Sequence, residues 1–343
     1  MSQSRSTRLV SVALAGLLAG CATMAFAEGE LNLYSSRHYD TDERLYSDFE
    51  EATGIRINRI EGNADEMIAR MSSEGANSPA DILLTVDTSR LKRAKDAGVL
   101  QAIDSAVLEE RIPSNLQDSD NQWFGFSQRG RIFLYDKNEL TDPPMTYADL
   151  ADPKYKGLVC IRSSGNTYNQ TLLASIVVHE GEDAARDWAQ GVVDNMARPP
   201  QGGDTDQIRG IVSGECVIAV SNTYYFARAL RTEVKGVSEE IDRIGWVFPN
   251  QDDRGAHMNL SGGGVAAHAP NRENAIKFLE YLASDQAQVY FSAGNDEFPA
   301  VNGVALADSV EKLGSFKADE IDLSIVAENI GTAQKIFNEV GWK

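Results

Sequence analysis

The chain has 343 residues, 51 acidic against 32 basic side chains, and a net charge of −19. This length has room for about two domains and a substantial buried core. A surface this acidic repels phosphates and anionic lipid headgroups, which argues against nucleic acid and membrane surfaces as partners.

The first 27 residues are predicted to be a secretory signal peptide. Arg5 and Arg8 give a positive start, an apolar run covers 9–20, and Ala-Phe-Ala at 25–27 is a small-x-small cleavage site. The apolar run is too short to span a bilayer. Cleavage lowers the basic count from 32 to 30 against 51 acidic side chains, so the mature charge is −21. We expect an exported, periplasmic protein.

A second export signal overlaps the first. Leu-Ala-Gly-Cys at 18–21 resembles a bacterial lipobox, in which the cysteine carries lipid. Cleavage after Ala27 and a lipid anchor at Cys21 both stay open. The complete charged start, apolar stretch and spacer favour cleavage after Ala27.

Two further cysteines are candidates for a disulfide. Cys160 and Cys216 both lie in strand-like segments of the same region. The exported compartment is oxidising, so we predict that they pair. No second cysteine pair or His-x-His spacing accompanies them, which argues against a zinc site.

From residue 30, short strand-like segments alternate with amphipathic ones. Strands are predicted at 30–35, 55–62 and 79–87, with helices at 41–54, 64–75 and 88–98. Thr88 is a plausible N-cap of the third helix, and Gly98 follows its end. Alternation of this kind predicts a doubly wound α/β sheet.

A long alternating strand at 123–137 is expected to cross into a second lobe, where the pattern restarts. Strands are predicted there at 158–162 and 216–221, with helices at 167–181, 182–196 and 204–215. The segment 243–250 is expected to form a second crossing, and 261–270 to lead into a helix at 271–284. The last helix is predicted at 332–340. The first lobe then comprises 28–125 plus 254–305, and the second comprises 126–253 plus 306–343.

Three segments resemble the solute-binding proteins of bacterial ABC importers. They read LNLYSSRH at the mature start, DPKYKG in mid-chain and NAIKFLEYLASDQAQVYF near the end. More narrowly, SSGNTYNQTLLAS and SNTYYFARAL resemble the ferric-ion-binding members of that superfamily. The resemblance implies a type II periplasmic binding protein fold with its ligand in the interlobe cleft, Fe(III) as cargo, and an inner-membrane importer permease as partner. We expect a monomer.

Tyrosines gather where predicted strands end, which is where open α/β sheets bind ligands. Tyr39, Tyr168 and the adjacent pair Tyr224 and Tyr225 follow three such strands. Ferric ion is hard and prefers anionic oxygen donors. A free phenol has a pKa near 10, and a bound high-charge cation drives its proton off. The tyrosines therefore predict a ferric site.

The resemblance assigns the same residues. Tyr224 and Tyr225 match the family's consecutive tyrosine pair, and Tyr168 and Tyr39 match further ligands of its tyrosine-rich branch. Another branch uses a carboxylate at the position that holds Val86 here. This difference favours the tyrosine-rich branch.

The neighbours of these ligands leave alternatives open. His38 either coordinates the metal or only hydrogen-bonds beside it. Arg129 and Arg131 point to one face of the crossing strand and would offset the phenolate charge. The alternative for both is a solvated arginine. Arg228, one turn beyond the tyrosine pair, is a further charge neighbour.

An additional anion is a separate question. Ser163 and Ser164, with the amides that start the next helix, could hold carbonate or another anion as a further ligand. The alternative is that this loop only caps the helix. With four phenols available, an anion is less needed.

The alternative binding function is that of a carrier of an organic solute, such as a polyamine or a small anion. A polyamine site needs carboxylates among aromatic walls. The loops offer tyrosines and few acids. A hydrolase lacks support, because the sequence contains neither G-x-S-x-G nor H-E-x-x-H. We expect a binding protein rather than an enzyme.

Overall fold

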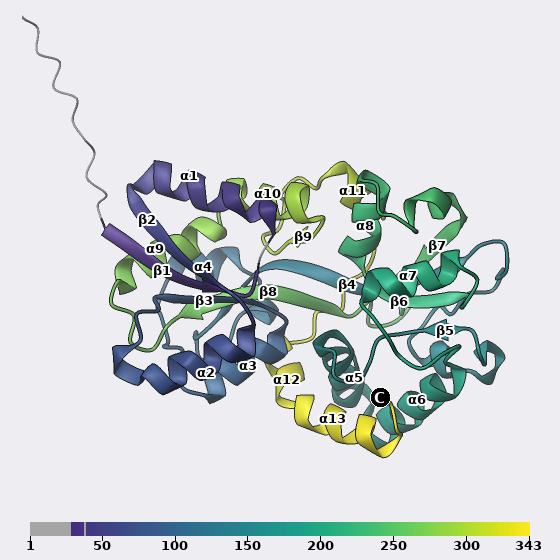
Figure 1. Cartoon of the computed structure of the whole chain (residues 1–343). Helices are drawn as coiled ribbons and strands as arrows, with labels where there is room; N and C mark the ends of the chain where they lie inside the picture. The colour runs from purple at the N-terminus through teal and green to yellow at the C-terminus, as the bar shows by residue number, and fades with distance from the viewer. Residues whose placement is uncertain (1–28, 38) are drawn as a thin grey trace, which may run out of the picture.

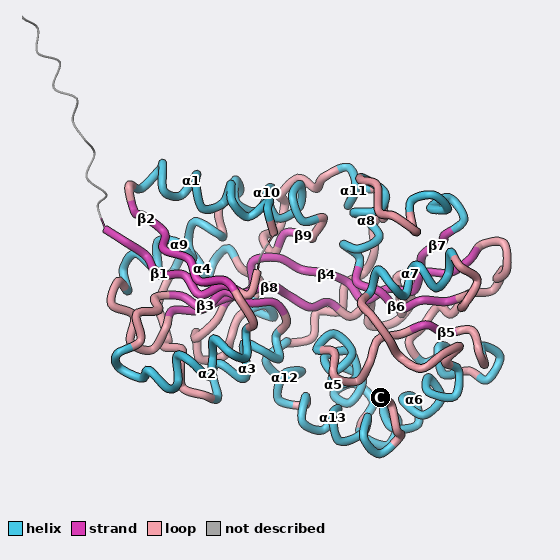
Figure 2. Tube along the Cα trace, in the orientation of Figure 1, coloured by secondary structure: helices cyan, strands magenta, loops and turns pink. Residues whose placement is uncertain are grey.

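The computed structural model describes residues 29–37 and 39–343. The signal peptide, Cys21 and His38 lie outside them, so the predictions that concern these residues stay predictions. The described residues form one mixed sheet of nine strands with helices on both faces (Figures 1 and 2). Within these residues, we find no helix with both the length and the apolar character that a membrane span requires.

The first half-sheet follows the predicted alternation. β1 (Gly29–Ser35) lies between β2 (Ile55–Glu61) and β3 (Ile82–Val86), parallel to both. β3 is buried along its whole length, as expected for a strand covered on both faces. The helices of this half are α1 (Glu43–Thr53), α2 (Ala64–Glu74), α3 (Thr88–Asp96), α4 (Ala106–Arg111), α9 (Arg272–Leu282) and α10 (Asp285–Asn295).

The second half-sheet contains β6 (Ile218–Asn222), β5 (Val159–Cys160) and β7 (Ile244–Val247). β6 is parallel to β5. The helices around it and at the C-terminus are α5 (Thr167–Glu180), α6 (Glu182–Asn195), α7 (Asp204–Val212), α8 (Thr223–Arg231), α11 (Asp308–Glu311), α12 (Leu323–Glu328) and α13 (Ile330–Glu339).

One strand belongs to both half-sheets. The predicted long strand is present as β4 (Phe124–Asp136), which runs across the middle of the molecule (Figure 1). Its residues 124–130 pair with β8 (Met258–Val265), and its residues 131–136 pair with β6 and β7. The short β9 (Phe298–Pro299) pairs with β4 at 127–128. The halves therefore meet on β4.

The predicted second crossing is wrong in position. The segment 243–250 supplies β7, which pairs with β4 inside the second half-sheet, and the chain returns to the first half only afterwards. Residues 261–265 do not merely lead into a helix, because they form part of the central strand β8.

The glycines at 262–264 explain why β8 was not predicted as a strand. A Cβ at Gly263 would lie 2.6 Å from the carbonyl oxygen of Leu83, and one at Gly264 would lie 2.1 Å from that of Gln122. Glycine usually weakens strands, but it is required where neighbouring backbone approaches this closely. A composition signal typical of a loop therefore marks a packed strand.

A disulfide joins the end of β5 to the segment before β6 in the second half. Cys160 on β5 and Cys216 before β6 are bonded, with Cα atoms 5.8 Å apart. Both side chains are buried. The bond ties segments that are 56 residues apart in the sequence.

Candidate metal centre

A cleft of about 390 Å³ lies between the two halves, at the C-terminal ends of β1, β3 and β6. The first half contributes the N-terminal end of α2, whose backbone amides favour negative charge nearby. The residues that line the cleft are Ser36, Tyr39, Gly62, Asn63, Ala64, Val86, Arg90, Tyr168, Tyr224, Tyr225 and Arg228.

All four tyrosines predicted as ligands line this one cleft. Tyr39 follows β1, Tyr168 lies in the first turn of α5, and Tyr224 and Tyr225 lie in the first turn of α8. The hydroxyl oxygens of Tyr168 and Tyr224 are 3.2 Å apart. Tyr168, Tyr224 and Tyr225 are held by helix starts and Tyr39 by the loop after β1, so the phenols of both halves face a common space.

Tyr224 and Tyr225 can both border the cleft because α8 begins directly after β6, beside the cleft. β6 ends at Asn222, which is still extended, and the helix starts at Thr223. Tyr224 is buried and Tyr225 is half-buried, and their ring centroids are 4.2 Å apart at an interplanar angle of 30°. The two rings pack on each other while both border the cleft.

Burial keeps the phenols protonated when no cation is present. The pKa of Tyr39 is raised to about 12, chiefly by desolvation and also by the Glu297 carboxylate, while Arg37 and Arg129 oppose the rise. Desolvation also raises the pKa values of Tyr224 and Tyr225 well above the ordinary value, and Tyr168 adds to both shifts. A ligand that binds phenolates must therefore displace these protons.

Two buried arginines lie behind the tyrosines. The Arg129 guanidinium is 5.9 Å from the ring centroid of Tyr224, and that of Arg131 is 5.9 Å from the ring centroid of Tyr168. Each residue is 1% exposed, so neither is the solvated arginine of the alternative interpretation. Arg131 pairs with Asp204 at 2.6 Å.

The second half carries further positive charge at the cleft. Arg228 lines it, 5.6 Å from the Tyr225 ring centroid. Arg162 lies 5.4 Å from the Tyr168 ring centroid and shares the Asp204 carboxylate with Arg131. One carboxylate thus serves two arginines. Among the residues that the structure describes, no ion pair is seen for Arg228.

Several of these groups were missed by the sequence interpretation. Arg162 is the last residue of the strand predicted at 158–162, and this place at a strand end was a signal that could have found it. Asp204 is the first residue of α7, and an aspartate in this place indicates only the start of a helix in the sequence. Glu297 contacts Arg37 and Arg129 across 260 and 168 residues of sequence, and no local pattern reveals such contacts.

Val86 stands at the position where another branch of the family has a carboxylate ligand, and the structure places it at the cleft. The neighbouring Asp87 is fully buried. The Asp87 carboxylate accepts hydrogen bonds from Thr171 Oγ1 at 2.9 Å and Asn259 Nδ2 at 2.8 Å. None of the cleft-lining residues, within the described part of the chain, is acidic.

The serines considered for an anion lie elsewhere. Ser163 and Ser164 are not among the residues that line the cleft. The N-cap of α5 is Asn166, whose side chain makes no capping hydrogen bond. The Ser164 amide donates to the carbonyl of the C-terminal Lys343 at 3.2 Å. Arg90 and Arg228 are the basic side chains that border the cleft.

The donors that line the described cleft are phenol oxygens and not the side chains of the commoner metal sites. Across residues 29–37 and 39–343, no group of three or more His, Cys, Asp or Glu side chains is placed to hold a metal. Phenol oxygens, once ionised, are hard anionic donors that suit a small cation of high charge. Such a cation also supplies the energy that removes their protons.

The fold and cleft are those of a class of transport proteins. A family model described as bacterial extracellular solute-binding protein matches residues 77–319, and the chain belongs to this family. Its fold is the type II periplasmic binding protein fold, which confirms the expected fold class.

Particular relatives narrow the comparison. The chain is 49% identical to Iron uptake protein A1 of Synechocystis sp. over 315 residues, which cover 92% of this chain and 88% of that protein. It is similar to the solved structure of Trichodesmium IdiA (FutA) in complex with iron and citrate ligands, with a TM-score of 0.89, 50% identity, and coverage of 92% and 100%. For the ferric binding protein from Campylobacter jejuni the TM-score is 0.85, at 43% identity and coverage of 91% and 100%.

Proposed function

We propose that the chain captures ferric ion in the periplasm and delivers it to the permease of an ABC importer in the inner membrane. The observation that carries this proposal is the convergence of Tyr39, Tyr168, Tyr224 and Tyr225 on one cleft that has no acidic lining residue. The relatives named for iron uptake and ferric binding support it. The chain acts as a monomeric carrier and not as an enzyme.

Capture exchanges protons for one ion. Four phenolates supply four negative charges against the three positive charges of ferric ion, so the loaded centre carries one net negative charge. Arg129, beside the Tyr224 ring, and Arg228, beside the Tyr225 ring, stabilise that charge. Because binding displaces phenol protons, acid favours release.

The remaining members of the site are proposed with it. His38 precedes Tyr39 and either coordinates the ion or hydrogen-bonds beside it. A carboxylate-bearing or carbonate anion fits next to Arg90 and Arg228, and the Trichodesmium relative was solved with citrate as well as iron. The N-terminal signal in the sequence of this chain makes export by the signal peptide the proposed route to the periplasm.

The lobes proposed are 28–125 plus 254–305 and 126–253 plus 306–343. Tyr39 belongs to the first lobe, and Tyr168, Tyr224 and Tyr225 belong to the second. An ion that binds all four therefore closes the lobes on each other, with β4 as a shared strand at the hinge. A closed, loaded form presents a different surface to the permease than an empty form does.

The test is the colour of the iron-loaded protein. Purified protein with ferric iron should show a visible phenolate-to-iron charge-transfer band. Replacing Tyr224 and Tyr225 together by Phe should abolish it. Tyr34→Phe is the matched control, because Tyr34 is buried in β1 and its hydroxyl has no hydrogen-bond partner among the described residues. A colourless wild-type protein would exclude the proposed function.

An organic solute is the alternative cargo. A polyamine finds no carboxylate on the described cleft lining, which disfavours it. A small organic anion finds Arg90 and Arg228. Thermal stabilisation by such a compound without iron, together with no stabilisation by ferric ion, would favour this alternative.

A further inference from the structure

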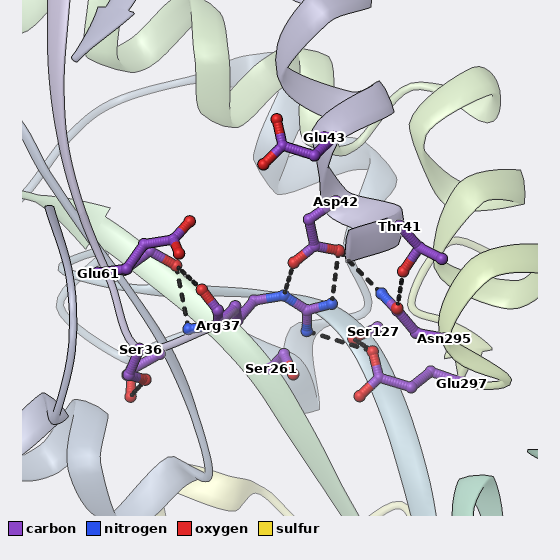
Figure 3. Close-up of polar contacts among 12 residues, drawn as sticks. Ser36, Arg37, Thr41, Asp42, Glu43, Glu61, Ser127, Ser261, Asn295 and Glu297 are labelled. Atoms are coloured by element: carbon purple, nitrogen blue, oxygen red, sulfur yellow. Dashed lines mark hydrogen bonds and ion pairs between the residues drawn. The ribbon is translucent and has the colours of Figure 1, made fainter. Parts of the chain in front are cut away.

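Four buried side chains of alternating charge, Asp42, Arg37, Glu297 and Arg129, are linked by ion pairs, and Figure 3 shows the first three. Glu297 is fully buried, in the short stretch between α10 and β9. Its Oε2 accepts hydrogen bonds from Arg37 Nη1 at 3.2 Å and Ser127 Oγ at 2.7 Å. Its Oε1 accepts from Arg129 Nη2 at 3.1 Å. One carboxylate therefore faces two guanidinium groups.

The two guanidinium groups lie against the candidate ligands. Arg37 is 4.9 Å from the Tyr39 ring centroid, and Arg129 is 5.9 Å from that of Tyr224. Arg37 also pairs with Asp42 through Nε at 3.0 Å and Nη2 at 3.2 Å. For Arg129, Glu297 is the carboxylate within ion-pair distance among the described residues.

This arrangement balances charge before any ion arrives. Arg37 and Arg129 are matched by Asp42 and Glu297, and all four side chains are at least nine-tenths buried. Buried arginines need such partners, since unpaired charge in the interior is costly. The match also removes most of the positive charge that would otherwise attract a negative centre.

We propose that Glu297 limits the hold of the protein on ferric ion, by cancelling the positive charge of Arg129 next to Tyr224 and of Arg37 next to Tyr39. The inference rests on the proposed ferric function, because the loaded centre of four phenolates and ferric ion has one net negative charge. A full positive charge at Arg129 would stabilise that centre. Glu297 opposes it and keeps the ion releasable.

The test is the direction in which ferric affinity changes. Removing the charge of Glu297 should tighten ferric binding, whereas removing a purely structural group should weaken it. Glu297→Gln keeps the size of the side chain, and its amide can donate to Ser127, whose hydroxyl can turn to accept. The variant should bind ferric ion about tenfold more tightly in competition with citrate. One charge at about 10 Å has an effect of this size at an effective dielectric constant of about 20. The charge-transfer band should also move to shorter wavelength, since the guanidinium charge lowers the energy of the phenolate electrons.

Two further variants separate charge from geometry. Ser127→Ala removes a hydrogen bond to Glu297 and leaves every charge in place, so its ferric affinity should equal that of the wild type. Asp42→Asn removes the other carboxylate of the chain and should also tighten binding. If Glu297→Gln folds poorly, Asp42→Asn still shows whether loss of a buried carboxylate tightens or weakens ferric binding. Weaker or unchanged ferric binding in folded carboxamide variants would overturn the proposal.

An iron-free measurement separates this proposal from the proposed function. In alkaline ultraviolet titration, phenols of Glu297→Gln should ionise at lower pH than those of the wild type. If the wild type binds no ferric ion, the ferric function fails, whereas this titration still tests the charge balance. An unchanged titration would overturn the role of Glu297 even in a protein that binds iron.

Discussion

Tyr168 and Tyr224 come from different helices of the second half, yet their hydroxyl oxygens are 3.2 Å apart. Tyr168 belongs to the first turn of α5 and Tyr224 to the first turn of α8. Before any cation binds, one phenol can donate a hydrogen bond to the other. This contact holds two proposed donors at a separation that two ligands of one ion can adopt.

Removing the Tyr168 hydroxyl should therefore weaken ferric binding. In Tyr168→Phe we expect ferric affinity to fall at least 100-fold by rough estimate, since a direct ligand matters more than its outer partners. The charge-transfer band should weaken. Tyr155→Phe is the control, because the Tyr155 hydroxyl donates to the Asp142 carbonyl at 2.9 Å, away from the cleft. Equal losses in both variants would count against Tyr168 as a ligand.

Ferric binding should release protons and weaken in acid. Tyr39, Tyr224 and Tyr225 have raised pKa values, so at neutral pH each enters the complex protonated and loses one proton. With at least three such protons, affinity should fall by at least roughly 1000-fold for each pH unit lowered. Proton uptake or release on adding ferric citrate in weakly buffered solution measures this. Release of fewer than three protons would contradict the assignment.

The empty protein should lose stability in alkali. Unfolded tyrosines ionise near pH 10, whereas burial raises the pKa of Tyr39 in the folded protein to about 12 and raises that of Tyr224 well above the ordinary value. Between these values the unfolded chain holds fewer protons, so the free energy of unfolding falls as pH rises. Each phenol contributes about 1.4 kcal/mol per pH unit. Denaturant titrations of the wild type and Tyr39→Phe should show a shallower fall in the variant.

Two glycines should respond to alanine with opposite signs. In Gly264→Ala the new methyl group meets the Gln122 carbonyl, so we expect a loss of roughly 1–3 kcal/mol in the free energy of unfolding. Gly331 lies in α13 with open space around it, so Gly331→Ala should stabilise by up to about 1 kcal/mol. Urea unfolding of both variants tests the pair. A tolerant Gly264→Ala would mean that β3, β4 and β8 pack less closely.

The sequence predicted what depends on local pattern. The alternation of strands and helices, the long strand at 123–137 and the four tyrosines beyond strand ends are all legible in short windows, because periodicity and strand ends are local properties. β8 was missed because its glycines mimic a loop, although close backbone contact requires them. Glu297 was missed because its partners Arg37 and Arg129 come from distant segments, which only folding brings together.

The alternation of side-chain faces along β4 restricts how the length of this strand can change. Arg129 and Arg131 occupy alternate positions of one strand, with Gly130 between them facing the other side. Inserting or deleting one residue before this stretch would exchange the two faces and bring Gly130 to where an arginine now lies. The same slip would rotate every later residue of β4 relative to β6 and β7. A length change of two residues would keep Arg129 and Arg131 on their present face of β4, whereas a change of one residue would need a further bulge beside the one already present at 125–127.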